Sequence, residues 1–112
     1  MNATAEKFKP VSLISSEEDI YLASHALKAM AHPLRLKILV QLGQTSEASV
    51  QDIVDHVGTS QSNISQHLSI LREKNIVTTR KDANKVYYRV GDPKILRLIG
   101  SLREAFCSAV RR

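Results

Sequence analysis

The chain of 112 residues has one cysteine, Cys107, and four isolated glycines. A single cysteine cannot form a disulfide framework or a cysteine-rich zinc module within one chain, although it leaves a bridge between two subunits open. No glycine-rich loop that would cradle phosphate is present, and neither is a Gly-x-Ser-x-Gly elbow. Because a nucleophile with its base and a paired-carboxylate site are also missing, the sequence does not indicate an enzyme.

Long apolar runs are missing as well. No stretch reaches the roughly 18 residues that a membrane span requires, and the N-terminus lacks the basic start and apolar run of a secretory signal. We therefore expect a cytoplasmic chain with no membrane partner. Its hydrophobic content of 43% suits one domain with a small core, which a partner subunit would enlarge.

Acidic residues are outnumbered by basic ones. Sixteen Lys and Arg against eleven Asp and Glu give a formal net charge of +5. A positive excess favours a polyanionic partner, either nucleic acid or an acidic membrane surface. Charge alone does not choose between the two.

The N-terminal third predicts an arm and two helices. Residues 1–15 show no sustained period, so we expect a flexible arm there and one folded domain over 16–112. Ser16 precedes three acids and is the expected N-cap of a first helix. Pro33 ends that helix and opens a second, for which Gly43 is the expected stop. The apolar residues that recur at helical spacing in the first helix are Ile20, Ala23, Leu27 and Met30.

Two further helices are expected to meet across a glycine turn. Ser49 caps the third helix with Asp52 at capping-box spacing, and Gly58 stops it. Ser60 caps the fourth, which runs to about Lys74 around a stripe of Ile64, Leu68 and Leu71. A short helix, a tight turn and a second amphipathic helix make a helix-turn-helix, whose second helix enters the major groove of DNA.

Beyond Asn75 the apolar period changes to two. Runs at 77–80 and 86–90 are rich in strand formers and flank a polar connection at 82–84, whose turn type stays open. Asp92-Pro93 then opens a fifth helix with the stripe Ile95, Ile99, Leu102, Phe106 and Ala109. The expected fold is mainly α with a β-hairpin wing, a winged helix-turn-helix of roughly five helices and two strands.

The outer face of the fourth helix and the hairpin together indicate nucleic-acid binding. The helix offers neutral groups that donate and accept hydrogen bonds and so can read base edges: Gln61, Ser62, Ser65, Gln66 and Ser69. The hairpin adds cations that suit the DNA backbone or minor groove: Arg80, Lys81, Lys85 and Arg89. Either feature alone is typical of ordinary solvated surface. Their combination with a net positive charge favours DNA.

Three segments in order resemble the ArsR/SmtB family of bacterial winged-helix repressors: 27–36, 60–71, and 77–81 with 86–88. The resemblance covers residues 23–106. It implies a symmetric homodimer, built from the first and last helices, that binds a palindromic double-stranded operator and leaves it when an effector is sensed. It also implies base readers at Gln61, Ser62, Ser65 and Gln66, flanked by Ser60 and His67, and wing contacts at Arg80, Lys81 and Lys85.

The metal sites that occur in this family lack their ligands here. Many relatives bind metal through a Cys-x-Cys pair near the start of the third helix, but residues 49–53 contain no cysteine. Another branch binds zinc between the paired last helices, and only Asp92 of its ligand set matches, because Lys94, Ala105 and Ser108 stand at the other positions. The histidines are dispersed: His25, His32, His56 and His67. We expect no metal and no cofactor.

A third branch of the family senses oxidants or reactive sulfur through two cysteines. Cys107 resembles the second of them, while Val40 stands at the position of the first, so no link can form within a protomer. A redox or reactive-sulfur response through Cys107 of two subunits is one hypothesis, and an inert helix cysteine is its alternative. Two other readings stay open: a repressor without a small-molecule effector, and a winged-helix protein-interaction module without DNA binding.

Overall fold

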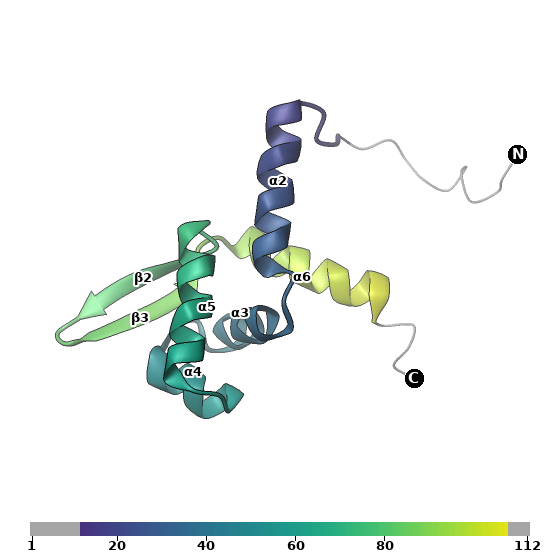
Figure 1. Cartoon of the computed structure of the whole chain (residues 1–112). Coiled ribbons are helices and arrows are strands. Elements are labelled where there is room, and N and C mark those ends of the chain that lie inside the picture. Colours follow the sequence, from purple (N-terminus) through teal and green to yellow (C-terminus); the bar gives the residue numbers. More distant parts are fainter. Residues whose placement is uncertain (1–11, 108–112) are drawn as a thin grey trace, which may run out of the picture.

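The computed structural model describes residues 12–107 (Figure 1). Its elements are, in order, α2 (Glu17–Met30), α3 (Pro33–Thr45), β1 (Ala48–Ser49), α4 (Val50–Val57), α5 (Gln61–Glu73), β2 (Val77–Asp82), β3 (Lys85–Val90) and α6 (Pro93–Phe106). The predicted winged helix-turn-helix is therefore confirmed. The hairpin of β2 and β3 projects beside α5, and α2 stands up from the body on the other side. Most of the predicted arm over 1–15, and Ala109 of the last stripe, lie outside the described residues.

The predicted helix caps are confirmed in detail. The hydroxyl oxygens of Ser16, Ser49 and Ser60 each accept a hydrogen bond from the backbone N–H three residues later, at 3.1 Å. The carboxylate of Asp52 completes a capping box by accepting the N–H of Ser49 at 3.0 Å. Gly58 ends α4 with φ of 85°, a left-handed conformation that glycine adopts without steric cost. These local bonds fix where the two helices of the helix-turn-helix begin and end.

Gly43 does not stop the second helix, contrary to the prediction. Helix α3 continues to Thr45 and ends at Ser46, whose φ is 71°. A Cβ atom built on Gly43 would lie 2.9 Å from the Cδ2 atom of Leu96 in α6. The glycine therefore serves the close packing of α6 against α3 rather than the end of a helix.

The sheet has three strands where the sequence predicted two. Strand β1 pairs antiparallel with β3 through Ala48 and Tyr88, and β3 pairs with β2, giving the order β1-β3-β2. Two residues are too few to show an alternating pattern, which is why β1 was missed. The hairpin turns through residues 83 and 84, and Ala83 has a φ of 55°.

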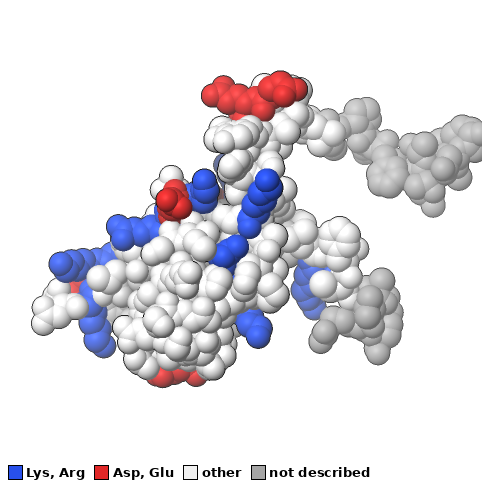
Figure 2. Space-filling view, in the orientation of Figure 1, with Lys and Arg blue, Asp and Glu red and all other residues white. Residues whose placement is uncertain are grey.

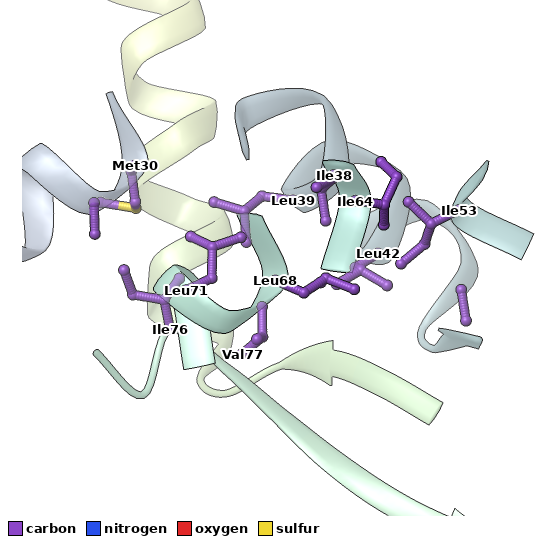
Figure 3. Close-up of a cluster of buried hydrophobic side chains, with 12 residues drawn as sticks. Met30, Ile38, Leu39, Leu42, Ile53, Ile64, Leu68, Leu71, Ile76 and Val77 are labelled. Carbon is purple, nitrogen blue, oxygen red and sulfur yellow. The ribbon is translucent and has the colours of Figure 1, made fainter. Parts of the chain in front are cut away.

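The core lies between α3, α5 and the base of the hairpin (Figure 3). All three residues of the predicted stripe of α5, Ile64, Leu68 and Leu71, are completely buried. They pack in one cluster with other buried side chains of α3, α4 and β2: Ile38, Leu39, Leu42, Ile53 and Val77. This packing holds α5 with its opposite face outward. Within residues 12–107 no helix has the length and apolarity needed to cross a bilayer.

Candidate nucleic-acid interface

The outer face of α5 is exposed and uncharged, as predicted. Its exposed side chains are Gln61, Ser62, Ser65, Gln66 and Ser69. In Figure 2 the broad front surface over the lower part of α5 is white, and acidic atoms appear only at its lower edge. The first turn of α5 carries no acid, and a helix N-terminus is the positive end of the helix dipole. This face can exchange hydrogen bonds with base edges and does not repel phosphate.

The turn before α5 holds the start of that helix in place. The side chain of Ser60 accepts the N–H of Asn63, and the amide of Asn63 donates back to the hydroxyl of Thr59 at 3.1 Å. Both bonds lie within one helical turn of Gln61. The first exposed side chains of α5 thus project from a backbone that its own cap immobilises.

His67 does not belong to the exposed reading face. It is half-buried, and its Nδ1 atom lies 3.0 Å from a guanidinium nitrogen of Arg35, which also donates to the carbonyl of Ala29 at the end of α2. Its ring centroid is 4.6 Å from that of His32, whose Nδ1 atom caps α3. Burial, followed by the neighbouring His32 and Arg35, lowers the pKa of His67. The geometry makes His67 a positioning residue that ties α5 to the junction of α2 and α3.

The wing presents its cations unequally. Lys81, Lys85 and Arg89 are exposed, and Lys and Arg atoms gather over the hairpin in Figure 2. Arg80 is instead occupied by the protein itself. Its Nε atom donates to Glu47 at 3.2 Å, and its Cζ atom lies 4.8 Å from the centre of the Tyr87 ring.

The ion pair between Arg80 and Glu47 shifts the pKa of both groups. The hydrogen bond from Arg80 lowers the pKa of the Glu47 carboxyl, and the same bond raises the pKa of Arg80. Asp82 adds a second carboxylate 3.6 Å from Arg80. Lys81 and Lys85 form no ion pair among residues 12–107, so they are better placed than Arg80 to meet phosphate.

Sequence reasoning missed Glu47 and Arg35. Glu47 precedes β1 and lies beyond β3 from Arg80, so only the three-stranded sheet brings the two side chains together. Arg35 lies 32 positions before His67 in the chain. Both contacts depend on tertiary structure, and no local pattern indicates them.

The two residues that the family resemblance linked to effector sensing, Asp92 and Cys107, lie at opposite ends of α6. Cys107 is exposed at the end of α6, and the carboxylate of Asp92 caps that helix by accepting the N–H of Lys94 at 2.8 Å. No group of three or more His, Cys, Asp or Glu side chains within residues 12–107 is arranged to hold a metal ion.

Comparison with known proteins gives consistent results. The family model described as bacterial regulatory protein, arsR family, matches residues 32–79. The nodulation protein NolR of Rhizobium meliloti is 43% identical over 80% of this chain and 72% of its own length. A biofilm growth-associated repressor of Agrobacterium fabrum is 40% identical over 73% of this chain and 69% of its own. The structure of HlyU from Vibrio cholerae, named a transcriptional activator, matches with a TM-score of 0.74 at 36% identity, covering 83% of this chain and all of that one.

Proposed function

Because the chain belongs to the arsR family of bacterial regulatory proteins, we propose that it is a sequence-specific repressor that binds a palindromic DNA operator as a homodimer in the cytoplasm. The family consists of transcriptional regulators and not of enzymes. The observation that carries the proposal is the exposed, uncharged, hydrogen-bonding face of α5 beside a cationic hairpin. The alternative of a protein-interaction module gives no reason for this combination.

In the proposed complex the two surfaces have different tasks. Gln61, Ser62, Ser65 and Gln66 meet base edges, and a glutamine can pair with both N6 and N7 of adenine. Lys81 and Lys85 meet phosphate. The two copies of α5 in a dimer lie about one DNA turn (~34 Å) apart in successive major grooves.

The homodimer is supported by apolar side chains that the single chain leaves uncovered. Helix α6 has no buried residue, and Phe106 near its end is 74% exposed. The large apolar residues that are exposed on α2 and α6 are Ile20, Tyr21, Leu22, Leu27, Leu98, Leu102 and Phe106. Apolar surface on this scale marks an interaction site, and a second copy would cover it symmetrically.

A change on α6 tests the dimer. Leu102→Asp combined with Phe106→Asp places charge in the proposed interface, and we expect monomers in analytical ultracentrifugation. Val86→Asp changes a similarly exposed apolar residue on the hairpin and should leave the dimer intact. A monomeric wild type, or a double variant that stays dimeric, would contradict the assignment.

Competition binding tests sequence-specific recognition. A labelled duplex from the region upstream of the protein's own gene is titrated by fluorescence anisotropy and competed with unlabelled random duplex of equal length. Specific regulators bind their sites on the order of a thousand-fold or more tighter than random DNA, so random duplex should compete poorly. If random duplex competes as well as unlabelled upstream duplex does, the protein does not recognise a specific operator in that region. Because HlyU is named an activator, a promoter–reporter fusion with and without the protein tests repression separately.

Cys107 supports a redox response as a second, finer proposal. The thiol is exposed, and a dimer joined through α6 would bring two copies near each other. Hydrogen peroxide would join two thiols in a disulfide, taking two electrons and two protons to form water. We expect a linked dimer on a non-reducing gel and loss of operator binding in the wild type, and neither in Cys107→Ser. Equal release of both proteins by peroxide would leave a repressor without this sensor.

A further inference from the structure

A cavity of about 680 Å³ lies between α3 and the end of α4. Pro33, Leu36 and Val40 of α3 form one apolar wall, and Val57, the last residue of α4, stands in the other. Sites for small organic ligands span about 300–1,000 Å³ and are lined mainly by apolar groups with a few polar ones. The cavity therefore has the size and the lining of a small-molecule site.

The polar groups of the lining favour an anion. Lys37 lies on the same face of α3 as Leu36 and Val40, and its side chain forms no ion pair among the described residues. Two imidazoles, of His32 and His56, complete the charged or titratable part of the lining, which contains no acid. A carboxylate on an otherwise apolar molecule complements this arrangement.

Gln41 adds an unsatisfied acceptor. It lies one helical turn after Lys37, lines the cavity and is 4% exposed. Its Nε2 atom donates to the carbonyl of Asp52 at 3.4 Å, while its Oε1 atom is the buried side-chain atom that has no hydrogen-bond partner in the described part of the chain. Burying an acceptor without a partner is unfavourable. Because the Oε1 atom itself is shielded from solvent, a hydroxyl or N–H group of a ligand would supply the missing donor once the Gln41 amide turns towards the cavity.

We propose that this cavity is an effector site for a small, mainly apolar carboxylic acid that carries a hydrogen-bond donor, and that its occupancy weakens operator binding. The second half rests on the proposed function. His32 lines the cavity and its ring packs against His67 of α5, while Val57 lies directly before the glycine turn that leads into α5. A ligand that contacts both His32 and Val57 touches two features that position α5. These are the ring contact with His67 and the turn that leads into the start of the helix.

Three probes test the chemistry of the site in the protein without DNA. The first is 3-(4-hydroxyphenyl)propionate. The second, 3-phenylpropionate, lacks the hydroxyl, and the third, 3-(4-hydroxyphenyl)propan-1-ol, lacks the carboxylate. We expect saturable amide shifts around the cavity in ¹H–¹⁵N NMR spectra, with each incomplete probe about three-fold weaker or more. The absence of any saturable shift would overturn the site, and this is also the result expected if a partner subunit covers the cavity. Equal affinity for all three probes would overturn it as well.

Two variants locate the binding. Lys37→Met should remove the preference for the acid over the alcohol, whereas Lys94→Met, an equal change on α6, should keep it. Val40→Trp fills the cavity from a position that is 44% exposed, so the fold should persist in circular dichroism while all three probes lose affinity. Unchanged probe binding by Val40→Trp would place the shifts elsewhere and contradict the proposal.

Operator binding tests the regulatory half separately. We expect saturating 3-(4-hydroxyphenyl)propionate to weaken operator binding about five-fold in the wild type, which is a typical size of allosteric coupling, and not at all in Val40→Trp. Probe binding with unchanged operator affinity would overturn the regulatory half alone. Failure of the apo-protein to recognise any operator would count against the proposed function, while the NMR result would still decide the site.

Discussion

The reading helix and the wing lie side by side and differ in almost every physical respect. Helix α5 exposes only uncharged side chains from Gln61 to Ser69, is capped at its start and is held by three completely buried residues. The hairpin is charged and mostly exposed, and only Val77 at its base is buried. Base recognition needs fixed donor and acceptor positions, whereas attraction to phosphate tolerates movement. In the proposed complex with DNA, this difference would make α5 the source of specificity and the wing the source of affinity.

The largest effect is expected from loosening α5 at its buried face. Leu68 is completely buried, and Leu68→Ala should lower the free energy of unfolding by about 2–5 kcal/mol through lost burial and the cavity left behind. Urea denaturation measures this. Ser69→Ala, at the exposed neighbouring position, should change it by less than about 0.5 kcal/mol. Similar effects of the two changes would mean that the core does not anchor α5.

A smaller loss is expected at the start of α5. Ser60→Ala removes the hydroxyl that accepts the N–H of Asn63 and should cost about 1 kcal/mol of unfolding free energy. Ser65→Ala removes an exposed hydroxyl from the middle of the same helix and is the matched control. If thermal melts show no difference between them, the cap does not stabilise the reading helix.

The wing should gain affinity when its ion pair is weakened. Glu47→Gln removes the charge that neutralises Arg80, so binding to operator and random DNA should rise together by a few-fold, with a steeper dependence on salt. Anisotropy titrations over a salt series measure both quantities. Glu17→Gln makes the same change of net charge at the far end of α2 and should have a much weaker effect. Improved binding to operator alone would contradict a purely electrostatic wing.

The mildest expected effect concerns pH. The pKa of His67 is lowered in the folded protein, so at pH values below the ordinary pKa of 6.5 the unfolded chain binds more protons at this residue than the folded protein does. At pH 8 the residue is neutral in both states and has no effect on stability. The free energy of unfolding should therefore fall as pH drops below about 6.5 towards the lowered pKa. His67→Asn keeps an acceptor near Nδ1 but does not titrate, so its melting temperature should fall less between pH 7 and pH 5.5. Parallel pH profiles would assign the loss to other groups.

Local sequence patterns predicted the helices of the helix-turn-helix and the exposed side chains of α5. Caps such as Ser49 and Ser60 bond within three residues, and the stripe through Ile64 and Leu68 repeats at helical spacing, so both are readable from neighbouring positions. The exposure of Gln61 follows directly from that stripe.

Features that depend on distant partners were not readable. Gly43 looked like a helix stop because glycine commonly ends helices, whereas here it admits Leu96 of α6. His67 was predicted to lie at the DNA from the family resemblance, whereas in the structure its ring contacts Arg35 and His32. The pairing of Arg80 required β1, which is too short to predict.

The ratio of operator to random-DNA affinity, measured for two single variants, tests the division between helix and wing most directly. Gln61→Ala should lose about 1–3 kcal/mol at the operator and little on random duplex, so the ratio falls. Lys85→Ala should weaken both duplexes alike and reduce the salt slope by about one, so the ratio stays constant. Equal losses on both duplexes for Gln61→Ala, or a changed ratio for Lys85→Ala, would contradict the account.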